Sequence, residues 1–435
     1  MSGNPDFTLK IDQNKYLPEG GQEVHAIVTV EASGAPAGVV TGSTAAAEVI
    51  IIDTSGSMDY PGTKMSSAIK AAKTAVDALR DGVHFAVVSG SARAQMVYPT
   101  GERLVAADTG TRQQAKAALD QVRAGGGTAI GAWLGLADRL FAGHQDGIRH
   151  AILLTDGKNQ HESPEQLDAT LATCAGRFVC DCRGVGTDWE VAELRKVASA
   201  LLGSVDIAAH PNDLVADFQA MTEAAMGKAV ADVVLRVWTP QAARLRFVKQ
   251  VLPTVEDLTG RRTDAGPRAG DYPIGAWGAE SRDYHISVEV APGVVGQELR
   301  AAWVKLVLPG SGGEEQVLAT GNVLAEWTDD EAQSTRINPR VAHYTGQAEL
   351  AGAIREGLQA RKDGDLDTAT ARLGRAVALA HESGNDAIAS LLDKVVDVED
   401  PATGTVRLKK NVDKADEMSL DTRSSKTVRT RKGGG

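Results

Sequence analysis

The sequence predicts an α/β protein with a doubly wound, mostly parallel sheet that is inserted into an antiparallel β-sandwich, followed by a small helical module and a disordered tail. Between residues 46 and 228, short apolar runs alternate with segments of helical spacing, which is typical of βαβ units. The segments on either side alternate apolar and polar residues with period two, as antiparallel strands with one exposed face do. Beyond residue 340 the apolar residues recur at helical spacing, and the end of the chain is polar.

These changes in composition and periodicity divide the chain into regions. We predict N-terminal sandwich strands at 1–45, the parallel-sheet domain at 46–228, the rest of the β-sandwich at 229–330, the helical module at 340–396 and a disordered, basic, Ser/Thr-rich tail at 400–435.

The central region is predicted to form buried parallel strands that are joined by helices. Its strand candidates are short runs rich in β-branched residues, and its helix candidates have apolar residues three or four positions apart. The strands are predicted at 48–52, 84–91, 150–157 and 178–187, and the helices include 64–80, 112–122 and 129–141. Because crossovers between parallel strands are right-handed, we expect helices on both faces of the sheet.

The flanking regions are expected to fold differently. We expect the strands before residue 46 to pair with those after residue 228, so that the parallel-sheet domain interrupts the sandwich. In the helical module, Gly364 and Gly384 break the helical pattern, which predicts three short helices. The tail from residue 400 has few large apolar residues; since burial would not offset the entropy of ordering it, we expect disorder.

Composition and charge restrict the class of protein. A net charge of −11 argues against nucleic acid as the main partner. We find no signal-like N-terminal segment and no apolar run long enough to cross a membrane. The cysteines, Cys174, Cys180 and Cys182, are an odd number and do not suit a disulfide framework or a zinc site, so we expect buried free thiols. A cytoplasmic location follows as the expectation.

Oxygen-bearing side chains follow the predicted strands. Asp53, Ser55 and Ser57 come directly after a buried strand, Asp156 follows another, and Thr128 follows a run of glycines. Ligands of open parallel sheets bind at the carboxyl ends of the strands, so we expect these side chains to converge. Two carboxylates and three hydroxyls are hard donors without imidazole or thiolate, which favours Mg²⁺ or Mn²⁺ over Zn²⁺.

This pattern resembles the D-x-S-x-S, Thr and TDG motifs of von Willebrand factor type A domains, which form the metal-ion-dependent adhesion site. The resemblance covers residues 46–228 and implies that Ser55, Ser57 and Thr128 contact the metal directly, whereas Asp53 and Asp156 act mostly through water. It also implies that an acidic side chain of a protein partner completes the coordination. The flanking β-sandwich is similar to that of intracellular bacterial members.

Other kinds of site fit these residues less well. Helix capping and an ordinary turn could explain each residue alone, but all five would then coincide by chance. Phosphatases of the haloacid dehalogenase type need an acid at the position of Ser55, and no phosphate-binding G-x-x-x-x-G-K-[ST] segment exists. Two alternatives stay open: a metal-assisted hydrolase, for which His161 is the nearest base and is expected to be polar surface, and a subunit of an ATPase- or chelatase-like complex. We expect a non-enzymatic signalling adaptor.

The tail carries hydroxyls between basic residues. It resembles the tails of bacterial type A domain proteins that are encoded beside Ser/Thr kinases and forkhead-associated domains, which implies phosphorylation by such a kinase and recognition by such a domain. A plain basic extension is the alternative. The phosphorylation candidates are Thr422, Ser424, Ser425, Thr427 and Thr430.

Overall fold

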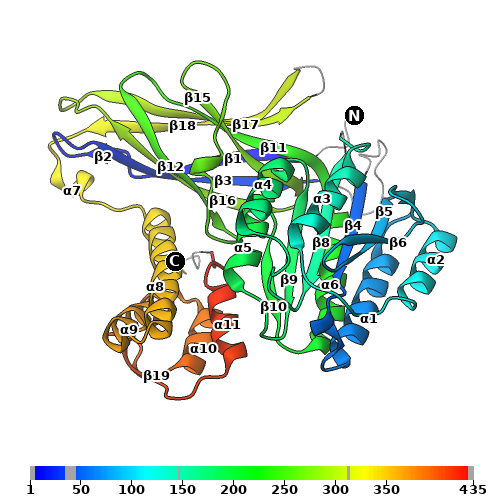
Figure 1. Cartoon of the computed structure of the whole chain (residues 1–435). Helices are drawn as coiled ribbons and strands as arrows, with labels where there is room; N and C mark the ends of the chain where they lie inside the picture. Colours follow the sequence, from blue (N-terminus) through cyan, green and yellow to red (C-terminus); the bar gives the residue numbers. More distant parts are fainter. Residues whose placement is uncertain (1–4, 35–45, 146, 311–313, 430–435) are drawn as a thin grey trace. The chain divides into compact units, whose positions relative to one another are not determined.

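The computed structural model of the chain describes residues 5–34, 46–145, 147–310 and 314–429. They form two compact units (Figure 1). The first unit contains the described residues of 46–231 and 275–278, and the second contains those of 5–34, 232–274 and 279–429. The first unit therefore interrupts the second in sequence, as predicted.

The first unit is built on a doubly wound sheet. Its strands are β4 (Ala46–Asp53), β5 (His84–Gly90), β6 (Ala94–Tyr98), β7 (Val105–Ala106), β8 (Ile148–Thr155), β9 (Val179–Val185) and β10 (Val205–Ala208). Their order is β10–β9–β8–β4–β5–β6, with β7 also paired to β5. Only β6 and β7 run antiparallel. The chain leaves β4 for β5 and returns on the other side of β4 as β8, so the switch point lies between β4 and β8.

Helices cover both faces of this sheet (Figure 1). On one face, α1 (Thr63–Ala78), α2 (Thr109–Leu119) and α6 (Leu214–Met226) share a core with Ile50 and Ile52 of β4. The opposite face carries α3 (Ile130–Phe141), α4 (Pro164–Cys174) and α5 (Val191–Ala200). All eight residues of β4 are buried, as the apolar run predicts for a strand with a helix layer on each side.

The second unit contains the predicted β-sandwich. One sheet has the order β1–β3–β16–β12–β13 and the other β14–β15–β11–β17–β18–β2. The bounds are β1 (Asp6–Gln13), β2 (Tyr16–Leu17), β3 (Glu23–Ser33), β11 (Lys228–Trp238), β12 (Ala243–Leu252), β13 (Glu256–Asp257), β14 (Thr263–Asp264), β15 (Ala269–Gly278), β16 (Ser281–Val290), β17 (Glu298–Pro309) and β18 (Glu315–Trp327). Val24 of β3 lies opposite Val288 of β16, which confirms that strands from before and after the inserted unit pair.

The helical module is larger than predicted. After the short α7 (Glu331–Ser334), it contains α8 (Pro339–Lys362), α9 (Leu366–Ser383) and α10 (Asp386–Val395). It continues with a hairpin of β19 (Val396–Asp400) and β20 (Thr405–Leu408), and with α11 (Lys414–Arg423). Gly384 ends α9 with a left-handed φ of 64°, as a C-terminal glycine commonly does.

The prediction of a disordered tail from residue 400 was wrong for the described residues. Leu420 of α11 is fully buried in the same core as Ile354 and Leu373. Beyond α11, the amide of Val255 donates to Ser425 O at 2.8 Å, and Thr427 Oγ1 donates to Val251 O at 2.6 Å. The tail has few apolar residues, but these are enough to order it because they pack against α8, α9 and β12. Tertiary packing of this kind provides most of the stability of a helix.

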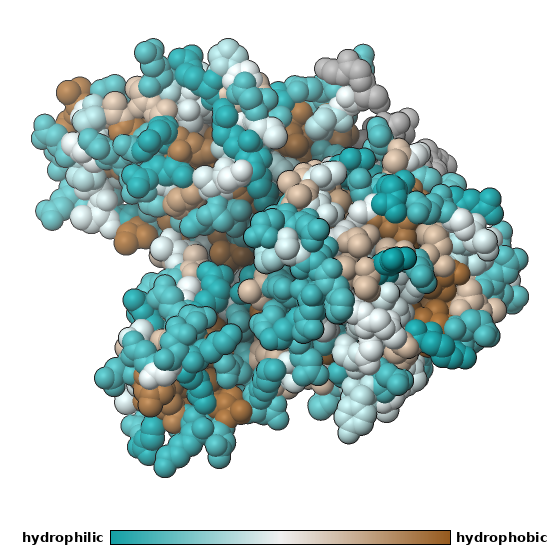
Figure 2. Space-filling model, in the orientation of Figure 1, coloured by the Kyte–Doolittle hydropathy of each residue, from teal (hydrophilic) through white to brown (hydrophobic). Residues whose placement is uncertain are grey.

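The face of the molecule drawn in Figure 2 is mainly polar. Figure 2 shows hydrophilic side chains over much of the visible face, with apolar side chains in smaller groups. Within the part of the chain that the structure describes, none of the helices combines the length and the apolar character that crossing a membrane requires.

Candidate metal site

Asp53 is the last residue of β4, beside the switch point. Its buried carboxylate accepts a hydrogen bond from the Ser55 amide at 2.7 Å and another from Thr155 Oγ1 at 2.5 Å. Since Thr155 ends β8, the second bond joins the carboxyl ends of the two central strands. Burial raises the pKa of Asp53 to about 6, and the hydrogen bonds from Thr155 and Ser55 oppose this rise only in part.

The two serines connect Asp53 to Asp156. Ser55 Oγ lies 2.9 Å from Ser57 Oγ, which donates to Asp156 Oδ1 at 2.7 Å. Ser55 and Asp156 are buried, whereas Ser57 is exposed in the short 3-10 helix η1 (Gly56–Asp59). The hydroxyls therefore form a hydrogen-bonded chain that runs from the buried strand end to the surface.

Thr128 joins this group at Gly157. A Cβ added to Gly157 would lie 3.3 Å from both Ser57 Oγ and Thr128 Oγ1, and 3.9 Å from Ser55 Oγ. The three hydroxyls therefore lie near one another on the same side of Gly157, the residue that follows Asp156. The structure brings the five predicted residues together at one edge of the sheet.

Backbone hydrogen bonds fix the glycine-rich loop before Thr128. The Gly56 amide donates to Gly126 O at 2.9 Å, and the Gly125 amide donates to Thr54 O at 2.7 Å. Gly126 has a φ of +89°, which side-chain-bearing residues rarely adopt. The glycines therefore let this loop lie against the D-x-S-x-S segment.

His161 has a positioning role that the sequence did not reveal. Its Nδ1 accepts a hydrogen bond from the Thr128 amide at 3.1 Å, and its own amide donates to Thr128 O at 2.9 Å. Glu162 Oε1 accepts from the Gly131 amide at 2.6 Å, and Asn159 Oδ1 accepts from the Ile130 amide at 2.9 Å. The loop after β8 thus caps α3 and holds Thr128 in place.

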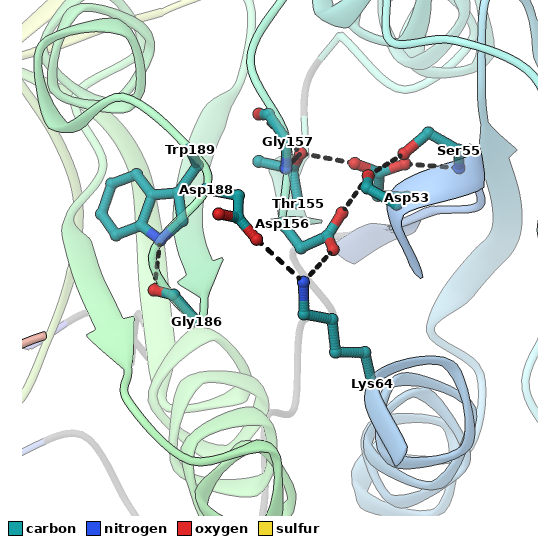
Figure 3. Close-up of polar contacts among 10 residues, drawn as sticks. Asp53, Ser55, Lys64, Thr155, Asp156, Gly157, Gly186, Asp188 and Trp189 are labelled. Carbon is teal, nitrogen blue, oxygen red and sulfur yellow. Dashed lines mark hydrogen bonds and ion pairs between the residues drawn. The ribbon is translucent and has the colours of Figure 1, made fainter. Parts of the chain in front are cut away.

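Lys64 is a second residue of the site whose role the sequence did not reveal. It lies on α1, and its Nζ donates to Asp156 Oδ2 at 2.7 Å and to Asp188 Oδ2 at 3.3 Å (Figure 3). Burial lowers the pKa of Lys64, but the hydrogen bond and charge of Asp156, together with Asp188, outweigh this effect and raise its pKa above the usual value. The amphipathic pattern of α1 did not indicate that Lys64 is buried, because a lysine in the first turn of a helix is usually exposed.

The donor set suits a hard divalent cation. It consists of two carboxylates and three hydroxyls in a region that is mostly buried, and such oxygens are preferred by Mg²⁺ and Mn²⁺. Among the described residues, no cluster of three or more His, Cys, Asp or Glu side chains could hold a metal, so a cation site here depends on the hydroxyls. A cation near Asp53 would also favour the ionised form that burial disfavours.

Two further predictions concern residues outside this site. Cys174, Cys180 and Cys182 are free and buried, which confirms the prediction. Thr422, in α11, and Ser424, directly after it, are 1% and 2% exposed, so the expectation that they lie on an accessible tail was wrong. Thr430 lies outside the described residues.

Comparisons with known proteins agree with this arrangement. A von Willebrand factor type A domain model matches residues 47–207, and a von Willebrand factor type A C-terminal domain model matches residues 378–424. A solved structure described as von Willebrand factor type A from Catenulispora acidiphila is 54% identical, with 98% of each chain covered and a TM-score of 0.93.

More distant relatives match less closely. The ArnB paralog VWA2 from Sulfolobus acidocaldarius shares the fold, with a TM-score of 0.62 and 14% identity over 96% of this chain and 98% of that one. An uncharacterized protein from Synechocystis sp. is 27% identical over 216 residues, which are 48% of this chain and 49% of that protein. The match therefore spans about half the length of that curated relative.

Proposed function

This chain belongs to the von Willebrand factor type A family, and we propose that it is a cytoplasmic protein-interaction scaffold and signalling adaptor that binds an acidic side chain of a partner protein through a Mg²⁺ or Mn²⁺ ion. The convergence of three hydroxyls and two carboxylates at the carboxyl ends of β4 and β8 carries this proposal. Domains of this family commonly bind a divalent metal ion.

Each residue would contribute to the metal site in a different way. Ser55, Ser57 and Thr128 supply neutral oxygens, whereas Asp53 and Asp156 supply the negative charge. Neutral ligands leave the bound ion attractive to a further anionic ligand, and a carboxylate from the partner is such a ligand. A bound ion would supply the positive charge that the partner carboxylate recognises.

Two observations favour binding over catalysis. His161, the nearest candidate base, uses its Nδ1 to accept the Thr128 amide. Tyr60, three residues after Ser57, is 85% exposed, and exposed aromatic side chains commonly anchor protein interfaces. We therefore propose a protein-binding surface at this edge without enzymatic activity.

The test is a pull-down of partners from native lysate in 1–5 mM Mg²⁺ or in EDTA, about the concentrations at which weak divalent sites fill. The variant Ser55→Ala/Ser57→Ala removes two neutral ligands without leaving a buried charge unpaired, and we expect it to abolish Mg²⁺-dependent capture. Thr128→Ala should weaken capture less because one neutral ligand is lost. Asp77→Ala, on the exposed side of α1, is the matched control.

Asp156→Ala should also abolish capture, but it leaves Lys64 beside only the exposed Asp188, so its folding must be checked by circular dichroism. Capture that persists in EDTA would contradict the role of the ion. Phosphoester hydrolysis by the wild-type protein that disappears in the serine variant would instead favour a metal-assisted hydrolase.

We further propose that a Ser/Thr kinase modifies the C-terminal segment and that a forkhead-associated domain recognises the product. Ser425 is half-buried, and the Thr427 hydroxyl is bonded to Val251 O, so phosphate on Thr427 would displace the segment from β12. Mass spectrometry of protein from native cells should find phosphate at Ser425, Thr427 or Thr430 more often than at Thr422 or Ser424. Equal modification of the two buried residues would contradict this order.

A further inference from the structure

The carboxylate of Asp156 accepts hydrogen bonds from both a hydroxyl of the candidate site and the ammonium group of Lys64. Its Oδ1 accepts from Ser57, and its Oδ2 accepts from Lys64 at 2.7 Å. Asp156 is fully buried, and the side chain of Lys64 is only 8% exposed. The candidate site therefore contains a protein cation next to one of its two carboxylates (Figure 3).

The path of the Lys64 side chain is fixed by its surroundings. A Cβ added to Gly186 would lie 3.6 Å from Lys64 Cε, an ordinary van der Waals distance, so the turn at Gly186 borders the lysine side chain. The buried Trp189 holds this turn, because its Nε1 donates to Gly186 O at 3.0 Å. Lys73, on the same helix, instead pairs with the exposed Asp120.

We propose that Lys64 is an internal counter-cation, which keeps the metal-binding side chains assembled without an ion and lowers the affinity of the site for a divalent ion. This inference rests on the metal site of the proposed function. A buried carboxylate without a partner is strongly destabilising, and Lys64 removes that cost at Asp156. The same charge repels a divalent ion that uses Asp156, since like charges a few ångströms apart interact strongly in a partly buried region.

This arrangement has a consequence for partner binding. Because Lys64 opposes the ion, the negative charge of a partner carboxylate is needed to offset the repulsion. Metal and partner should therefore bind cooperatively, each raising the affinity of the other by the same factor. Lys64 thus favours a metal site that fills together with the partner.

The test compares the full-length wild type with Lys64→Met and with the control Lys73→Met. Isothermal titration with MgCl₂ should show that Lys64→Met binds Mg²⁺ about tenfold more tightly than the wild type, given the strength of such charge interactions. In EDTA, Lys64→Met should unfold at a lower temperature than the wild type, and Mg²⁺ should raise its unfolding temperature more. Lys73→Met should match the wild type in magnesium affinity.

Equal or weaker Mg²⁺ binding by Lys64→Met would overturn the inference, because Lys64 would then only position Asp156. If Lys64→Met does not fold, Lys64→Gln and Lys64→Arg provide the comparison: tighter binding by the Gln variant supports the proposal, and equal affinities overturn it. These results are independent of the partner pull-down, which tests the proposed function with Lys64 intact.

Discussion

At the scale of single residues, the negative charge of Asp53 is unfavourable in the folded protein without a metal ion. The carboxyl is fully buried, and its pKa of about 6 reflects desolvation that two hydrogen bonds do not offset. Between the ordinary pKa of 3.8 and about 6, the folded state binds more protons than the unfolded state. The stability of the metal-free protein should therefore fall as pH rises through this range.

Asp53→Asn removes this charge and keeps a side chain of the same shape. In EDTA at pH 7.5 we expect the free energy of unfolding to rise by about 1–3 kcal/mol, because a shift of one pKa unit corresponds to about 1.4 kcal/mol. The rise should nearly vanish at about pH 3, below both pKa values, where the wild-type carboxyl is largely protonated in both states. Urea unfolding at the two pH values measures this, and a variant that is less stable at pH 7.5 would contradict the argument.

At the scale of elements, a second buried charge cluster joins three parallel strands at their amino ends. His150 of β8 lies with Nδ1 2.8 Å from Glu48 Oε1 of β4 and with Nε2 3.1 Å from Asp181 Oδ2 of β9. Burial opposes protonation of His150, but the two carboxylates raise its pKa to about 10. The sequence offered only a polar residue near each strand start. The register of the paired strands β4, β8 and β9 brings these three residues together.

His150→Gln removes the cation that Glu48 and Asp181 share, so it should destabilise the protein by about 3 kcal/mol. Because the pKa of His150 is raised from 6.5 to about 10, its stabilising charge is fully present below pH 6.5 and is lost as pH rises toward 10. Thermal unfolding of the wild type from pH 6.5 to 10 should show this decline, and His150→Gln should show less of it. The exposed His210→Gln should behave like the wild type.

At the scale of the whole molecule, residues far apart in sequence complete the second unit. Asp283 of β16 is fully buried and accepts hydrogen bonds from Arg340 and Tyr344 of α8, the first at 2.8 Å. The segment after α11 adds to this contact, because His343 Nε2 donates to Val428 O at 2.7 Å. The helical module and the sandwich are therefore joined by polar contacts as well as by the apolar cluster around Tyr344.

Thr427→Val should weaken this attachment, because it leaves the Val251 carbonyl without its hydroxyl donor. We expect a loss of about 1 kcal/mol in unfolding free energy and faster tryptic cleavage after Lys426. Thr320→Val, at an exposed position of β18, should change neither. Unchanged cleavage in Thr427→Val would show that the hydroxyl bond does not hold the segment.

The sequence was enough to predict the five residues of the candidate metal site and the interrupted order of the two units. The reason is local: strand ends are marked by the last apolar residue, and parallel strands bring their carboxyl ends to one edge of a sheet. Lys64, His161 and the ordered segment 400–429 could not be predicted in this way. Their environment comes from side chains that are distant in the sequence, such as Asp156, Thr128 and Val251. Burial and charge pairing depend on those neighbours, so only the tertiary structure decided which polar residues face inward.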